Sequence, residues 1–157
     1  MKKQIILLTN LFLFLGSLAL NAQDAQQECN IKYNLFKGDY QSKKYEDAYP
    51  NWMYLMDNCQ KLSINVYKLG DKLAQVRFKN AENKTEAAAL VKRVYLQRLE
   101  NFPAKDPAKA HSNYATFLIK NKLASDEEVF EILQLAYSLD PTRMSVKNIY
   151  RYFQGIT

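Results

Sequence analysis

Glycine and proline are rare in this sequence, and their scarcity limits the fold more than any other feature. Only four glycines and four prolines occur among 157 residues, while apolar residues recur at intervals of three and four along most of the chain. That spacing places apolar side chains on one face of an α-helix. Because the pattern typical of strands is absent from the sequence, we predict an all-α domain.

Residues that stop and start helices divide the chain further. Asn83 lies three residues before Glu86, and Ser125 lies three residues before Glu128. Each pair is an N-cap signal, because the first side chain can accept a hydrogen bond from a free N–H group of the first helical turn. Pro107 after Asp106 is a further start signal.

These signals predict seven helices. Pro50 lies inside the second helix, so we expect either a kink there or a helix that begins only near Asp47. The predicted helices cover about 30–42, the residues from the break at 42–44 to about Cys59, 63–80, 84–101, Pro107 to about Leu123, Ser125 to the residues before Asp140, and 143–154.

The start of the chain resembles a leader for export. Lys2 and Lys3 precede an almost unbroken apolar run, and a plausible cleavage site follows at Ala22 or, alternatively, at Ala19. This is the three-part pattern of a secretory signal peptide. An uncleaved membrane anchor is the alternative, although a spanning helix needs roughly 20 apolar residues. We predict a signal peptide over 1–22, a short segment over 23–29 and the helical domain over 30–157.

The two cysteines are placed to form a disulfide. Cys29 opens the first predicted helix and Cys59 closes the second, so an antiparallel pair of helices brings both sulfurs to the same end. An oxidising compartment outside the cytoplasm favours the bond. Two free, buried thiols are the alternative. With no histidine or further cysteine nearby, the pair is no zinc motif, and we expect neither a metal nor another cofactor.

Charge argues against nucleic acid as a partner. The net charge of +6 falls to +4 when Lys2 and Lys3 leave with the leader, and basic residues alternate with acidic ones along the predicted helices. Nucleic-acid-binding domains instead cluster lysine and arginine on one face. The sequence also offers no catalytic set, because His111 is the only histidine and no local motif supports it. We therefore expect no enzyme activity.

Three segments, in order, resemble the tetratricopeptide repeat family. They are Lys44 to Ala48 with Trp52, then Leu69-Gly70, then Leu135 to Pro141; in addition, Tyr33 and Leu35 recur 34 residues later as Tyr67 and Leu69. With its export signal and its cysteine-bracketed first helix pair, the chain more closely resembles the secreted helical-repeat proteins of gram-negative bacteria. The resemblance implies a right-handed α-solenoid of about three antiparallel helix pairs plus a C-terminal helix.

Such an array binds protein segments on its concave face, which the first helix of each pair forms. With Leu69-Gly70 as the register mark, the residues expected on that face are Asn34, Gln41, Tyr67, Asp71, Gln75, Thr116 and Lys120. We expect an exported, non-catalytic scaffold or assembly factor of the cell envelope, in the periplasm, at the outer membrane or outside the cell. A module that binds an envelope glycan is the alternative, followed by a small helical hydrolase or inhibitor.

The last predicted helix is apolar on more than one side. Its apolar residues include Val146, Ile149, Tyr150 and Phe153, whereas a repeat array normally ends in a helix with a polar outer face. We expect a cover for this helix: a second copy of the chain, another protein or the remainder of a longer array.

Overall fold

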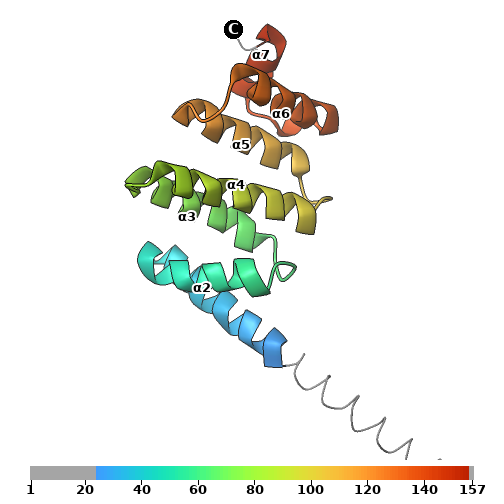
Figure 1. The fold of residues 1–157 in the computed structure, drawn as a ribbon. Coiled ribbons are helices and arrows are strands. Elements are labelled where there is room, and N and C mark those ends of the chain that lie inside the picture. The colour runs from blue at the N-terminus through green and yellow to red at the C-terminus, as the bar shows by residue number, and fades with distance from the viewer. Residues whose placement is uncertain (1–23, 156–157) are drawn as a thin grey trace, which may run out of the picture. The chain divides into compact units, whose positions relative to one another are not determined.

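The computed structural model describes residues 24–155, which are helical apart from short turns and loops and contain no strand (Figure 1). The predicted signal peptide, residues 1–22, lies outside the described residues. The chain divides into two compact units on either side of Leu62 and Ser63. The all-α prediction is confirmed for the described part of the chain.

The first unit contains an N-terminal helix, described over residues 24–41, and α2 (Tyr45–Asn58). Residues 24–29 are already helical, so the first helix begins earlier than the predicted start at about residue 30, and Cys29 lies inside it. Between the two helices Lys43 adopts a left-handed conformation, with φ of 60°. The fully buried side chains of this unit are Phe36, Ala48, Trp52, Leu55 and Met56.

Pro50 is accommodated inside α2 without ending it. The helix runs from Tyr45 to Asn58, so the residues on both sides of Pro50 are helical. A proline lacks the N–H that would bond to the carbonyl four residues earlier, and this close to the start of a helix only one such bond is lost. The predicted late start near Asp47 is therefore wrong by two residues.

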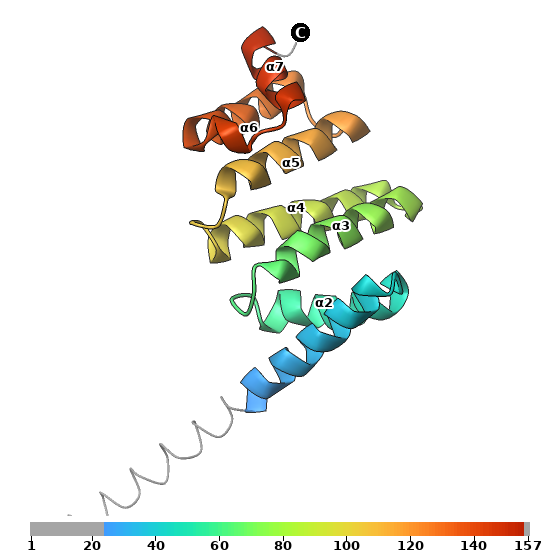
Figure 2. The same ribbon diagram turned by 180° about the vertical axis from the view of Figure 1, so that it is seen from behind.

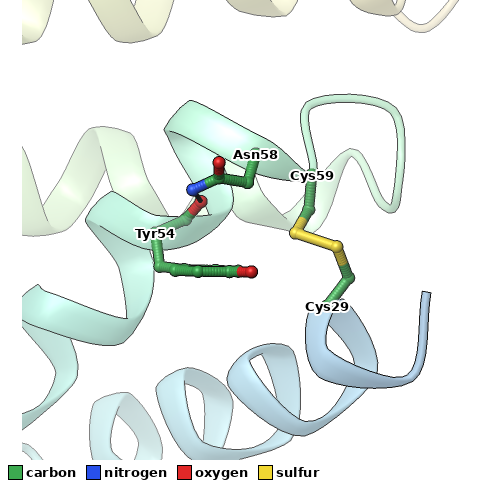
Figure 3. The surroundings of a disulfide bond; sticks show 4 residues. All are labelled: Cys29, Tyr54, Asn58 and Cys59. Carbon is green, nitrogen blue, oxygen red and sulfur yellow. Dashed lines mark hydrogen bonds between the residues drawn. A yellow bond between two sulfur atoms is a disulfide. The ribbon is translucent and has the colours of Figure 1, made fainter. Parts of the chain in front are cut away.

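A disulfide joins the two helices of the first unit (Figure 3). The Cys29 and Cys59 Cα atoms are 5.8 Å apart, and the bond closes a separation of 30 residues. Beside it, the Asn58 side chain donates a hydrogen bond to the carbonyl of Tyr54. The structure thus contains the predicted disulfide, and it crosslinks the N-terminal helix to the end of α2.

The second unit contains five α-helices and one short 3-10 helix (Figure 2). They are α3 (Asn65–Asn80), α4 (Lys84–Asn101), α5 (Pro107–Asn121), α6 (Asp126–Leu139), η1 (Pro141–Arg143) and α7 (Val146–Gln154). α3 packs along α4 and α5 packs along α6, while α4 and α6 also contact α5 and α7 respectively. Consecutive helices are therefore neighbours in space.

Local capping explains where these helices begin. Asn83 accepts a hydrogen bond from the Glu86 N–H, and Ser125 forms a complete capping box with Glu128. The predicted seventh helix differs, because Pro141–Arg143 forms the separate turn η1 and α7 starts only after Ser145, which caps it. Among the residues that the structure describes, no helix is both long enough and apolar enough to cross a bilayer.

Candidate functional site

The side chains of α3 and α5 border an open hollow of about 360 Å³. We call it the basic hollow; its lining residues are Lys72, Gln75, Val76, Phe78, Lys79, Phe117, Lys120 and Asn121. The α3 residues Lys72, Gln75, Val76 and Lys79 are spaced three and four apart, so the helix presents them on one face. The hollow is thus a product of two helix faces within one unit.

Two aromatic rings form the apolar part of the basic hollow. Phe78 of α3 and Phe117 of α5 meet edge to face, with ring centroids 5.0 Å apart, and both are largely buried. Edge-to-face packing of this kind is favourable beyond the area it buries. The contact fixes α3 against α5 at this point and gives the hollow an apolar floor.

The rim of the basic hollow is positively charged. Lys72, Lys79 and Lys120 are exposed, and none of the residues that line the hollow is acidic. Lys84 adds a further positive charge nearby: its Nζ donates to the carbonyls of Phe78 and Lys79 at 2.7 and 2.9 Å and lies over the Phe78 ring. The hollow therefore combines an apolar floor with an excess of positive charge, which favours an anionic ligand.

A second, much smaller hollow of about 20 Å³ lies between α3, α4 and α5. We call it the polar hollow; it is lined by Tyr67, Asp71, Val94, Tyr95, Arg98, Ala110, Asn113 and Tyr114. Gln75 connects the two hollows, because it lines the basic one and its Nε2 donates to Asp71 at 3.0 Å. A ligand in the basic hollow that displaced Gln75 would change the surroundings of Asp71.

Arg98 is a buried charge in the wall of the polar hollow. Its exposed fraction is 8%, and its guanidinium donates to the carbonyls of Lys105 and Asp106 at the end of the α4–α5 loop. Its Nε is buried without a hydrogen-bond partner. Burial raises the pKa of Asp71 across the hollow and lowers the pKa of Arg98, while their mutual attraction opposes both shifts. The two opposite charges belong to α3 and α4 and attract each other across the hollow.

The only histidine of the sequence, His111, contacts the aromatic wall of the polar hollow through Tyr95. Tyr95 stacks on Tyr114 with ring centroids 4.1 Å apart, and the Tyr95 hydroxyl lies 2.7 Å from Nδ1 of His111. Burial lowers the pKa of His111 and raises the pKa of Tyr95 to about 12, so both groups are neutral near pH 7. The hydrogen-bond partner of His111 is thus a tyrosine and not the carboxylate that the hydrolase alternative requires.

Neither sequence nor structure comparison assigns the chain to a family. No family model, curated protein or solved structure matches it. The site is therefore interpreted from its own residues.

The structure brings some of the predicted concave-face residues together. Gln75 and Lys120 line the basic hollow, and Asp71 lies in the adjoining polar hollow. Asn34 and Gln41 are exposed on the N-terminal helix, which belongs to the other unit.

Two of the predicted residues serve internal contacts. Tyr67 is fully buried: its ring packs on Phe102 and its hydroxyl accepts a hydrogen bond from Asn101, so it cannot contact a partner directly. Thr116 accepts a hydrogen bond from Asn148 and donates one to the Ser112 carbonyl. Tyr67 therefore supports the surface from within, whereas Thr116 is exposed.

Sequence reasoning predicted Lys120 but missed Lys72, Lys79 and both phenylalanines of the basic hollow. Lys72 and Lys79 lie three residues before and four residues after Gln75, so helical spacing alone places them on the face already chosen for Gln75. Phe78 and Phe117 could not be found in that way, because their contact joins residues far apart in the chain.

Proposed function

We propose that this chain is an exported, non-catalytic protein-binding scaffold of the cell envelope, built as a tetratricopeptide-like array of helix pairs. The observation that carries the proposal is the basic hollow, where α3 and α5 present three exposed lysines around Phe78 and Phe117. In a tetratricopeptide-like array these would be the first helices of successive pairs, which form the concave binding face.

The chemistry of the basic hollow indicates the kind of segment it would bind. An apolar side chain would pack on Val76 and the two phenylalanine rings, and acidic side chains beside it would pair with the lysines of the rim. Charge complementarity of this kind raises association rates and selects partners more than it adds affinity. The proposed ligand is an extended, acidic protein segment with a large apolar residue.

The disulfide supports the proposed location. Disulfides persist in oxidising compartments such as the periplasm and are rare in the cytosol. The Cys29–Cys59 bond fits an exported protein with the leader expected over residues 1–22.

The binding proposal can be tested with peptides selected from a displayed random library against the native protein. We expect the selected peptides to be acidic with one large apolar residue. The variant Lys72→Glu/Lys79→Glu/Lys120→Glu should bind them at least about tenfold more weakly, and added salt should weaken wild-type binding. Fluorescence anisotropy of labelled peptides measures both effects.

A matched control keeps the test specific. Lys61, Lys68 and Lys92 are exposed lysines outside the basic hollow, so Lys61→Glu/Lys68→Glu/Lys92→Glu makes the same change in net charge elsewhere. Equal losses in the two variants would attribute binding to net charge and not to the hollow. Failure to select any peptide, with binding of an anionic polysaccharide instead, would favour the glycan-binding alternative.

A further inference from the structure

The C-terminal helix α7 turns its apolar side toward solvent. Val146, Tyr150 and Phe153 lie four and three residues apart, on one face, and they are 82%, 62% and 68% exposed. Ile149, at the edge of that face, is partly buried. A surface helix ordinarily turns such a stripe toward the core, so the rotation of α7 about its axis is the reverse of the usual one.

Polar contacts fix this rotation. Asn148, on the opposite side of α7, is fully buried, and its Nδ2 donates to the Ser112 carbonyl, the Ser112 hydroxyl and the Thr116 hydroxyl at 2.8 to 2.9 Å. Its Oδ1 accepts a hydrogen bond from Arg151 at 3.1 Å. Rotating α7 to bury its apolar stripe would break these hydrogen bonds, three of which come from a fully buried side chain, and their loss costs free energy.

Aromatic packing holds α7 in the same orientation. Tyr152, four residues after Asn148, stacks on Tyr137 and Phe130 of α6 with ring centroids 4.6 and 5.5 Å apart. Asn148 and Tyr152 together face α5 and α6. The sequence and these contacts therefore specify the outward apolar face of α7, the helix that lies beside α6 in Figure 1.

The charge of α7 indicates which kind of surface could cover this apolar face. The helix contains Lys147 and Arg151 and no acidic residue, so it favours an anionic surface. Association of two copies through α7 would oppose two like-charged helices, which disfavours that contact. A short amphipathic helix with aromatic side chains on its apolar face and basic residues beside it is typical of binding in the plane of a membrane interface.

We propose that α7 binds the surface of an anionic lipid bilayer, with Val146, Tyr150 and Phe153 entering the headgroup region and Lys147 close to lipid phosphates. Tyrosine is enriched at this depth in membranes, because its ring is apolar and its hydroxyl is polar. The inference is independent of the basic hollow, since none of the residues that line that hollow belongs to α7. A scaffold bound in this way would be held at a membrane surface without a spanning helix.

Flotation with vesicles tests the proposal. The full chain is mixed with vesicles of phosphatidylglycerol or of phosphatidylcholine, and any contribution of residues 1–23 is the same in every variant. We expect binding to phosphatidylglycerol, weak binding to phosphatidylcholine, and a loss of about tenfold or more in the partition coefficient for Val146→Ser/Tyr150→Ser/Phe153→Ser. Lys147→Glu should weaken binding to phosphatidylglycerol in particular.

The control variant replaces exposed apolar residues elsewhere in the chain. Ile31, Leu35 and Leu96 are about half exposed and lie outside α7, so Ile31→Ser/Leu35→Ser/Leu96→Ser should bind vesicles as the wild type does. Equal binding by the α7 variant and the wild type would overturn the proposal. It would also be overturned if sedimentation equilibrium showed a dimer that the α7 substitutions dissociate, while no variant bound vesicles.

Discussion

His111 illustrates how a single buried group in this protein responds to its surroundings. The side chain is 8% exposed, its Nδ1 is bonded to the Tyr95 hydroxyl, and burial holds its pKa below the usual 6.5. Tyr95 and Tyr114, which lie beside it, have raised pKa values and stay protonated. Among these three side chains, His111 is thus the one that can change charge between neutral and mildly acidic pH.

We expect acid to destabilise the fold through His111. In the unfolded chain the imidazole binds a proton below about pH 6.5, whereas in the folded protein it does so only at lower pH. The free energy of unfolding should therefore be highest above pH 6.5 and should fall as pH drops from there through the folded pKa. Urea denaturation across this range should show that the free energy of unfolding depends less on pH in His111→Gln than in the wild type. An equal pH dependence in the two proteins would contradict the role given to His111.

Helical spacing decides the position of some of the predicted residues, and tertiary contacts decide the position of others. Gln75 and Lys120 share the basic hollow because the face of each helix follows from its period. Tyr67 lies on the same face of α3 as Asp71, yet Phe102 and Asn101 at the end of α4 bury it. Those contacts join residues more than 30 positions apart in the sequence, and no local sequence pattern predicts them.

At the scale of elements, the ends of helices were the most predictable feature. Asn83 and Ser125 cap α4 and α6 as expected, because capping depends on residues three apart and on little else. The separate turn η1 was missed: Asp140 accepts from the Thr142 N–H and hydroxyl, and this local bonding ends one helix before Ser145 begins the next. The sequence indicated an exposed apolar face on α7, but the contacts that orient this face lie on α5 and could not be predicted.

Asn148 should therefore determine whether α7 remains docked. Asn148→Leu removes the donor to Ser112 and Thr116 and places an apolar side chain against their polar atoms, which should cost about 1–3 kcal/mol. We expect amide hydrogen exchange to accelerate over residues 146–154 and to change little in α3 and α4. Lys147→Ala, an exposed neighbour on the same helix, is the control. Undiminished protection of α7 in Asn148→Leu would show that aromatic packing alone holds the helix.

At the scale of the whole chain, the disulfide and the proposed binding surface belong to different units. The disulfide encloses most of the first unit, while the basic hollow lies entirely in the second. The second unit is held by buried apolar side chains, stacked rings and buried polar groups such as Arg98 and Asn148. The sequence predicted the disulfide from its cysteines and the expected compartment, but the division of the chain near Leu62 has no marker in composition.

Loss of the disulfide should affect the first unit most. A crosslink across 30 residues stabilises by about 3–4 kcal/mol on the chain-entropy model, and this should be lost in Cys29→Ser/Cys59→Ser. Hydrogen exchange should accelerate over residues 24–62, and chemical reduction of the wild-type protein should reproduce the change without any substitution. Unchanged exchange over these residues after reduction would contradict the prediction.

The sole tryptophan, Trp52, is fully buried in α2 and so belongs to the disulfide-bonded unit. Its fluorescence during denaturation will consequently report on that unit, whereas far-ultraviolet circular dichroism averages over all the helices. The two signals, recorded from one sample, thus follow the unfolding of the first unit and of all the helices separately. Coincident midpoints would mean that the chain melts as one cooperative body, and divergent midpoints would mean that a ligand or a membrane could stabilise one unit while leaving the other free to open.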